Sequence, residues 1–493
     1  MEQKNGLNRR DFIKKSVVSG AAISVIPAHV LGGKHGVAPS DKLNAALIGC
    51  GNMGLGFLNR WVQHPELQMI SVCDVNKESA DYPVFSRVSG EGKLGFVGGY
   101  EVGRRMVEEA YAKNIGKGKY RGCSAYTDFR ELIAKENDLD AVFIMTPDHL
   151  HTHISLTAMK NGLKVATHKP ISNFMYETRL TCDTAKEVGV PTHCFFFQDP
   201  PGLYTIMEIL KLGIIGKVKE VHRWTNRPVW PQGSPNLPTN NPPIPEGFDW
   251  QLWLGPSVDR AYSPDYTHRL FRGWYEFGGG VLADMGHYGL WRDWRVLDLG
   301  MPVSAKGNSS FSCEVRNFQS TPIVNEVTYP QASVIQYKVP VNGKSELVDV
   351  FWYDGGMMPR TPGALEKMGE ELSAEGGVMF IGEDGIILTA AGGYKDLQIL
   401  GVNDADKVAA ISQTQERTWT DNNDDEMIKA FKGGEASRGD FMHAQTISET
   451  ICLGNLAVRT RQKLDWDNEN MKVTNFDEAN RFLHREYRPG WEL

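Results

Sequence analysis

Several side chains near the middle of the chain have types and spacings that could bind and react with a hydroxyl group. In "FGGGVLADMGHYGLWRD" (residues 277–293), one helical face would carry Asp284, His287, Tyr288 and Trp291. A carboxylate and an imidazole bind hydroxyl groups, and an indole can cover the apolar face of a sugar ring. The pattern therefore favours a carbohydrate site over a stripe of core residues.

A lysine ends an apolar run earlier in the chain. In "ATHKPISN" (residues 166–173), His168 and Lys169 follow the run and Pro170 stops it. A lysine beside a redox cofactor could exchange a proton with a substrate hydroxyl during hydride transfer. Taken alone, however, this motif is better interpreted as a surface lysine at a strand end, so its meaning depends on what else lies there.

A glycine-rich turn predicts the cofactor. "GCGNMG" fits G-x-G-x-x-G directly after a predicted strand, and Asp74 ends the next strand twenty positions after Gly54. Such glycines permit a tight turn and bring a pyrophosphate close to a helix N-terminus. The acidic residue can accept hydrogen bonds from the adenosine ribose and would repel a 2′-phosphate, which favours NAD over NADP. A glycine turn without a ligand is the weaker alternative. The predicted contacts of NAD in this region are Gly49, Gly51, Asn52, Met53, Gly54 and Asp74.

A second loop is predicted at the same edge of the sheet. "TPDHLHTH" (residues 146–153) follows another apolar run, and ligands of open α/β sheets bind at the carboxyl ends of strands. Histidines this close together could also cap the following helix. The candidate cofactor contacts here are Thr146, Pro147, His149 and His151, and His168 and Lys169 complete the predicted site. No metal is expected, since no familiar ligand spacing occurs.

Alternating apolar strands and helices must position these residues. Near-continuous apolar strands that alternate with helices predict an α/β fold with a doubly wound parallel sheet. We expect this Rossmann domain to span residues 41–172. Its strands are predicted at 43–49, 68–75, 139–146 and 163–168, and its helices at 53–63, 126–137 and 151–162.

The pattern changes after Pro170. One more strand is predicted at 191–198, and the Pro- and Trp-rich segment 227–256 is a long loop that either serves a functional site or wraps the surface. Strand-like runs between 303 and 400 suggest a mixed or antiparallel sheet, and 442–460 predicts a helix. We therefore expect a second domain over residues 173–493.

These motifs, in this order, resemble the glucose–fructose oxidoreductase / inositol dehydrogenase (Gfo/Idh/MocA) family. The resemblance covers nearly the whole chain after its N-terminal segment. It implies a Rossmann domain followed by an α/β domain with an open, mostly antiparallel sheet, which often forms oligomers. It also implies that Lys169 and Asp284 are catalytic.

Two positions depart from the pattern of that family. His168 stands where the family has a glutamate, and Tyr288 stands four residues after Asp284, where the family has a histidine. His287 lies one residue earlier and would share the same helical face. Either His287 or Tyr288 is therefore the expected second acid or base.

The N-terminus predicts export. "NRRDFIKK" (residues 8–15) precedes a short apolar stretch and resembles a bacterial twin-arginine signal, and the stretch is too short to span a bilayer comfortably. A basic disordered tail is the weaker alternative. We expect residues 1–40 to be signal and linker, and the protein to be periplasmic without a stable membrane anchor. This pathway exports folded proteins, which suits an enzyme that binds its cofactor before export.

Composition narrows the functional classes. The 493 residues carry a formal net charge of −7 and no long basic run, which argues against a nucleic-acid partner. The 7 cysteines are scattered singly, with no spacing typical of zinc or of a full disulfide framework.

Together these patterns favour an NAD-dependent oxidoreductase that acts on a hydroxyl of a sugar or glycoside. The first alternative is a redox-neutral, NAD-dependent glycoside hydrolase, and the second is a non-catalytic nucleotide- or sugar-binding protein. The expected partners are a small carbohydrate and further copies of the chain. The sequence leaves open which sugar is bound.

Overall fold

The structure is a computed structural model that describes residues 39–83, 94–114, 120–196, 199–323, 325–390, 396–402 and 423–493. The chain divides into two compact units, Met1–Lys42 and Leu43–Leu493. In the first unit the described part is a 3₁₀ turn, η1 (Pro39–Asp41). The predicted export signal therefore lies almost entirely outside the described residues.

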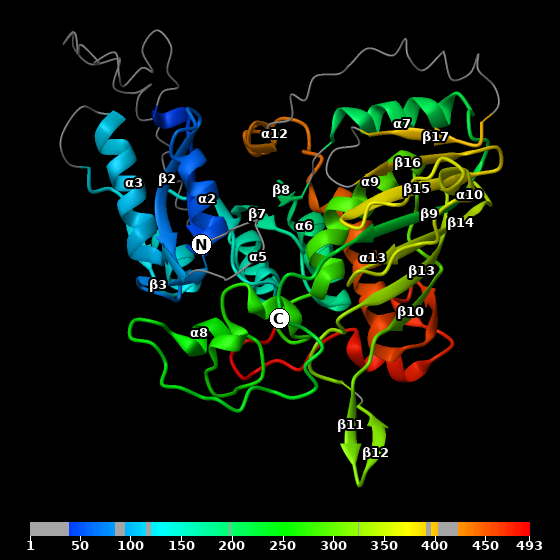
Figure 1. The fold of residues 1–493 in the computed structure, drawn as a ribbon. Helices are drawn as coiled ribbons and strands as arrows, with labels where there is room; N and C mark the ends of the chain where they lie inside the picture. Colours follow the sequence, from blue (N-terminus) through cyan, green and yellow to red (C-terminus); the bar gives the residue numbers. More distant parts are fainter. Residues whose placement is uncertain are drawn as a thin grey trace, which may run out of the picture. The chain divides into compact units, whose positions relative to one another are not determined.

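The second unit begins with a six-stranded sheet in which all neighbouring strands are parallel (Figure 1). Its strands, in spatial order, are β5 (Ser124–Tyr126), β2 (Leu67–Cys73), β1 (Leu43–Ile48), β6 (Ala141–Ile144), β7 (Lys164–His168) and β8 (Thr192–Phe195). The order reverses at β1, as in a doubly wound Rossmann fold, so the predicted fold of this half is confirmed. The short edge strand β5 was not predicted. The sheet also continues beyond residue 172, the predicted end of the domain, because β8 pairs with β7.

Helices cover both faces of this sheet. One core cluster joins the first and second helices to β1 and β2, and another joins the remaining helices to β6 and β7. Asp128 starts one of them by accepting a hydrogen bond from the backbone N–H of Arg130 at 2.9 Å, so this helix begins after the predicted position 126. The helices are α2 (Asn52–Trp61), α3 (Tyr100–Asn114), α4 (Phe129–Lys135), α5 (His151–Lys160) and α6 (Met175–Val188).

A second, nine-stranded sheet follows. All its pairs are antiparallel except β9 with β14, which confirms the predicted, mostly antiparallel sheet. Its strands, in spatial order, are β17 (Gln398–Leu400), β16 (Ile386–Ala390), β15 (Gly376–Gly382), β9 (Val218–Thr225), β14 (Leu347–Tyr353), β13 (Ser333–Pro340), β10 (Ser304–Ser309), β18 (Lys463–Asp467) and β19 (Lys472–Val473).

Helices α7 (Pro201–Lys211), α9 (His287–Leu297) and α13 (Phe441–Thr460) pack beside this sheet (Figure 1). Helix α13 confirms the helix predicted at 442–460. It approaches β10 so closely that a Cβ on Gly307 would lie 2.4 Å from the backbone nitrogen of Val458. This close packing fixes the segment that leads into α9, because α13 also packs against it.

The remaining short elements lie in connecting segments. The segment between β9 and α9 forms an aromatic cluster. Later in the chain, helix α12 (Asn423–Phe431) packs in the same core cluster as α2. In the described part of the chain, no helix is both long enough and apolar enough to cross a membrane. The connecting elements are β3 (Ser79–Pro83), β4 (Leu94–Gly98), η2 (Asp148–Leu150), α8 (Trp250–Leu254), η3 (Pro264–Tyr266), η4 (Leu270–Gly273), the π-helical turn η5 (Leu282–Gly286), β11 (Cys313–Arg316), β12 (Gln319–Pro322), α10 (Gly363–Glu366), α12 (Asn423–Phe431) and η6 (Asp477–Phe482).

The turn from β1 into α2 yields the first testable prediction. A Cβ on Gly54 would lie 1.9 Å from the backbone oxygen of Gly49, so Gly54→Ala must open the turn. We expect this substitution to lower the free energy of unfolding by about 1–3 kcal/mol, as overpacking of a core does. Gly56→Ala in the same helix is the matched control, because a Cβ there meets nothing within 4 Å. It should stabilise the helix by about 0.5–1 kcal/mol in the same chemical unfolding measurement. Equal effects of the two variants would contradict this interpretation.

Candidate active site

The β1–α2 turn has the geometry expected for a dinucleotide. Gly49 adopts φ +103°, and a Cβ there would lie 2.6 Å from the carbonyl carbon of Met145, so glycine is required on both grounds. The N-cap of α2, Gly51, makes no side-chain capping bond, which leaves the N-terminal turn of this helix available to an anion. Gly54 packs α2 onto the turn instead of facing the cavity.

Asp74 follows β2 beside this turn. Its Oδ2 accepts from the backbone N–H of Cys50 at 2.5 Å, and its Oδ1 accepts from that of Asn76 at 2.8 Å. Each carboxylate oxygen has a second lone pair for a further donor. Burial raises the pKa of Asp74 to about 6, although the two backbone hydrogen bonds oppose this shift.

The loop after β6 contributes Thr146 and Pro147 to the same cavity, but two of its predicted contacts lie elsewhere. His149 is fully buried, and its Nε2 lies 2.8 Å from the backbone oxygen of Trp253. His151 places its Nε2 2.9 Å from the backbone oxygen of Thr146 and its Nδ1 2.6 Å from that of Pro170. The two histidines thus hold backbone segments together outside the cavity. Their neighbours Asp148 and Leu150 line the cavity instead.

Lys169 directly follows β7, and its side chain reaches the segment before α9. Its side chain is 2% exposed, and its Nζ donates to the carboxylate of Asp284 and, at 2.6 Å, to the backbone oxygen of the same residue. The same Nζ lies 4.9 Å from the ring centroid of Tyr288. The structure thus brings together residues that lie more than a hundred positions apart in the sequence.

Arg272 is a second cation on Asp284 and was not predicted. Its Nε donates to Oδ1 of Asp284 at 3.1 Å. Burial alone would raise the pKa of Asp284, but the charges and hydrogen bonds of Lys169 and Arg272 hold it well below its usual range. Asp284 is therefore ionised at neutral pH and cannot supply a proton there.

His287 does not share the face of Asp284, contrary to the sequence prediction. The segment before it is the π-helical turn η5, whose wider turn rotates the chain less per residue. The fourth residue after Asp284, Tyr288, therefore returns to the cavity, whereas His287 does not. Its Nδ1 lies 2.7 Å from the backbone oxygen of Ala283 and its Nε2 3.3 Å from Oγ of Ser448 on α13.

The predicted indole and the buried histidine both belong to the core. Trp291 and His287 pack their rings against Phe196, with centroid separations of 5.5 and 5.4 Å. Burial lowers the pKa of His287 to about 3, so the ring is neutral at physiological pH. Of the two candidates for the second acid or base, Tyr288 lines the cavity and His287 does not, and burial raises the pKa of Tyr288.

His168 does line the cavity, in the position of the family glutamate. Burial, together with the charges of Lys169 and Arg272, holds its pKa well below the usual value, so the imidazole is neutral. Its ring meets that of Phe57 edge-on, with centroids 6.1 Å apart. The neutral imidazole of His168 thus stands where the family has the anionic side chain of a glutamate.

These groups share one cavity of about 330 Å³. Of the predicted site residues, Gly54, His149, His151 and His287 do not line it. Those that do are Gly49, Gly51, Asn52, Met53, Asp74, Thr146, Pro147, His168, Lys169, Asp284 and Tyr288.

Several residues of the wall were missed at the level of sequence. The Pro- and Trp-rich loop contributes Arg227 and Trp230, so part of this loop forms the site. The basic run "THRLFRG" (residues 267–273) was the available signal for Arg272. Tyr82 and Trp491 carry no local motif, since they reach the cavity only through tertiary folding.

Comparison with known proteins supports the same assignment. Residues 106–196 match the "Oxidoreductase family, NAD-binding Rossmann fold", and residues 208–293 match the "Oxidoreductase family, C-terminal alpha/beta domain". An alpha-N-acetylgalactosaminidase of Bacteroides fragilis is 25% identical over 196 residues, which cover 39% of either chain. A glycosyl hydrolase family 109 protein of Saccharopolyspora erythraea is 22% identical over 233 residues, covering 44% of this chain and 45% of the relative. The chain thus matches less than half the length of these relatives.

A solved structure is similar in fold over most of the chain. The WlbA dehydrogenase from Bordetella pertussis, in complex with NADH and UDP-GlcNAcA, aligns with a TM-score of 0.53 at 14% sequence identity. The alignment covers 86% of this chain and 99% of that one. At this identity the likeness concerns the fold, and it extends through both domains. Segments of both domains match models of the Gfo/Idh/MocA oxidoreductase family and the two-domain fold is in place, so the chain is similar to this family in both domains, and its first domain is an NAD-binding Rossmann domain.

Proposed function

We propose that this protein oxidises or reduces a hydroxyl-bearing carbon of a sugar or glycoside with bound NAD. The observation that carries the proposal is the single cavity that joins the Gly49–Gly54 turn and Asp74 to Lys169, Asp284 and Tyr288. Hydride transfer needs a dinucleotide site and a proton-exchanging group in one enclosed space.

The residues present fit the cofactor. The turn leaves no room for a Cβ on Gly49, the α2 N-terminus lacks a side-chain cap, and Asp74 retains acceptor capacity for a ribose. NAD⁺ bound there would accept a hydride from the carbinol carbon of the substrate, and the product is a carbonyl compound.

Lys169 has the role of exchanging the hydroxyl proton. In the oxidation direction its neutral amine takes the proton from the alcohol, and in the reduction direction its ammonium group returns it. Asp284 and Arg272 hold this group in position, because the carboxylate bonds both cations. Tyr288, whose ring lies against the Lys169 Nζ, is the second hydroxyl-binding group and replaces the family histidine.

A redox-neutral glycosidase is the second candidate, because two relatives are named as glycosidases. Oxidation of C3 to a ketone acidifies the C2 proton, so a base can remove it while the aglycone leaves. Water then adds across the double bond, and the same hydride returns to C3. No net oxidant is consumed. Such a cycle would also suit a cofactor that stays bound.

We further propose that the N-terminal segment directs export to the periplasm and that the second domain forms a homo-oligomer. The first rests on the twin arginines of residues 8–15, and the second on the family resemblance. An exported enzyme would keep its NAD through the transfer and regenerate it in place, by a second substrate or by the redox-neutral cycle.

The first test of function identifies the nucleotide and follows its redox state. The purified full chain should release NAD on denaturation, and absorbance of the reduced nicotinamide should rise with a substrate from a sugar panel. Lys169→Ala should lower turnover roughly 100-fold or more, because general acid–base catalysis contributes on that order. Unchanged turnover of this variant, or no bound or bindable NAD, would contradict the proposal.

The two candidate reactions differ in a solvent isotope readout. A glycosidase cycle should release the aglycone of a chromogenic glycoside in deuterated water, without added NAD, and leave deuterium at C2 of the sugar. A simple oxidoreductase should do neither. Aglycone release without C2 deuterium would exclude the elimination route.

Substitution of Tyr288 should affect mainly kcat, whereas substitution of the neighbouring His287 should affect mainly the free energy of unfolding. Tyr288→Phe removes a hydroxyl group in the cavity and should lower kcat roughly tenfold to 100-fold. His287→Gln should change kcat much less and lower the free energy of unfolding by about 1–3 kcal/mol, since it disturbs a buried hydrogen-bonded group. Steady-state kinetics and chemical unfolding of both variants measure the difference. A larger kcat effect at His287 would restore the sequence prediction.

NAD affinity should depend on pH through Asp74. The ionised carboxylate accepts from the ribose hydroxyls, and its pKa of about 6 means that it gains a proton as the pH falls through that value. Binding favours the ionised form, so the dissociation constant should rise below about pH 6 and level off above it. Asp74→Asn should bind NAD more weakly and lose this dependence. Calorimetric titration across the range measures both, and a pH-independent constant for the unaltered protein would contradict the assignment.

A further inference from the structure

The C-terminal tail, residues 483–493, contributes one residue to the wall of the cofactor cavity. Trp491 lines the cavity and is 8% exposed. Its ring packs against Phe129, with centroids 6.1 Å apart, and the guanidinium carbon of Arg130 lies 4.6 Å from its centroid. Its backbone oxygen lies 2.7 Å from Nε2 of His153 on α5. The indole thus lies between α4 and α5.

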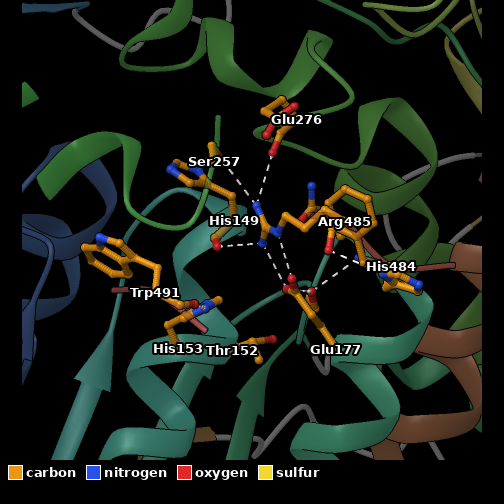
Figure 2. Close-up of polar contacts among 12 residues, drawn as sticks. His149, Thr152, His153, Glu177, Ser257, Glu276, His484, Arg485 and Trp491 are labelled. Carbon is orange, nitrogen blue, oxygen red and sulfur yellow. Dashed lines mark hydrogen bonds and ion pairs between the residues drawn. The ribbon is translucent and has the colours of Figure 1, made fainter. Parts of the chain in front are cut away.

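A buried ion pair anchors this tail to the Rossmann domain, as Figure 2 shows. Arg485 donates from Nε to Oε1 of Glu177 on α6 at 2.7 Å, and from Nη2 to Oε2 at 2.9 Å. The same Nη2 donates to the backbone oxygen of His149 at 2.9 Å. Glu177 is fully buried and Arg485 is 7% exposed. Burial opposes ionisation of Glu177, but Arg485 lowers its pKa below the usual value, so both groups are charged.

The tail also forms hydrogen bonds with α8 and with the residues that follow it, Pro256 and Ser257. Arg488 donates from Nη2 to the backbone oxygen of Gln251 at 2.6 Å, and its backbone N–H donates to the oxygen of Pro256 at 3.1 Å. Arg485 reaches Oγ of Ser257 at 3.3 Å in the same loop. A buried ion pair contributes little net stability after desolvation, so its use here indicates a need to position the segment.

The position of Trp491 corresponds to the adenosine half of the cofactor. In a Rossmann domain the pyrophosphate lies at the first turn, and the acid after the second strand binds the adenosine ribose. Asp74 follows β2, and Phe129 begins the helix after β5, the neighbour of β2. An indole against Phe129 is therefore on the Asp74 side of the turn, whereas Lys169 is on the opposite side, beyond β6.

We propose that Trp491 is a cofactor-binding residue that contacts the adenine of NAD, and that the Arg485–Glu177 pair positions it. The inference rests on the proposed binding of NAD in this cavity and adds a residue from the far end of the chain. Aromatic rings bind nucleobases by stacking or apolar contact, irrespective of base sequence.

The test separates the two halves of the cofactor. Full-length protein freed of nucleotide is titrated with NAD⁺, ADP-ribose and nicotinamide mononucleotide by calorimetry. Trp491→Leu should weaken NAD⁺ and ADP-ribose by the same factor, roughly 5- to 100-fold, which corresponds to the loss of one base–aromatic contact. Trp491→Phe should retain most of the affinity. Binding of nicotinamide mononucleotide should not change.

Trp466 provides the matched control. It is a tryptophan of β18 with 7% exposure, and its Nε1 donates to Oδ1 of Asn468 at 3.3 Å. Trp466→Leu should lower stability without changing the affinity for ADP-ribose. Circular dichroism and thermal unfolding of the nucleotide-free variants identify any variant that fails to fold. If Trp491→Leu does not fold, the affinity of Trp491→Phe for ADP-ribose is compared with that of the unaltered chain instead.

The positioning role of Arg485 has a readout that a purely structural role would not give. Arg485→Lys keeps the charge but loses the two-pronged contact, so ADP-ribose should bind more weakly. Combined with Trp491→Leu it should add little further loss, because the pair acts through the indole. Fully additive losses would overturn the positioning role.

Two outcomes distinguish a failure of this inference from a failure of the proposed function. If the unaltered chain binds ADP-ribose and Trp491→Leu binds it equally well, this inference falls and the proposed function stands. If the unaltered chain binds neither NAD⁺ nor ADP-ribose, the proposed function falls and the inference falls with it.

Discussion

The buried contact between Lys169 and Asp284 is the constraint on which the rest of the site depends. Lys169 directly follows a strand of the parallel sheet, and Asp284 lies in the π-helical turn that enters α9. A charged amine that is 2% exposed would be costly without a partner, so the two segments have to meet. Arg272 adds a second cation to the same carboxylate and keeps it ionised. Lys169, Arg272 and Asp284 together form one part of the cavity wall.

The histidines around this site illustrate how burial separates structural from chemical roles. His149, His168 and His287 all have pKa values below the ordinary histidine value, because burial disfavours their charged forms. The rings of His149 and His287 contact backbone carbonyls, and all three neutral rings leave the positive charge in the cavity to lysine and arginine. This arrangement suits a site that must accept a pyrophosphate and also hold a proton-exchanging amine.

The second domain contributes more than a platform for substrate. Its aromatic loop supplies Trp230, and the tail after α13 returns to the Rossmann domain with Trp491. Both segments close the same cavity from outside the parallel sheet. A binding site assembled from distant segments can hold a cofactor firmly, because release requires several of them to move together.

The sequence alone determined the individual strands, helices and turns that position the site. Apolar periodicity, together with the rule that parallel strands present their carboxyl ends at one edge, predicts the Gly49–Gly54 turn, Asp74 and the residues that follow two strands, Thr146 and Lys169. The parallel sheet and the long helix α13 were predicted for the same reason, since burial imposes a period on each element. The edge strand β5 was missed because it has only three residues.

Only the tertiary structure decided which neighbouring side chain faces the cavity. The π-helical turn before His287 changes the phase of the helix, and as a result Tyr288 faces the cavity in place of His287. Sequence periodicity assumes a regular helix and cannot report such a change. Arg272, Trp491 and the buried positions of His149 and His151 likewise depend on contacts between segments far apart in the chain. The sequence specifies each element through local spacing, whereas the site is completed by packing that no local spacing encodes.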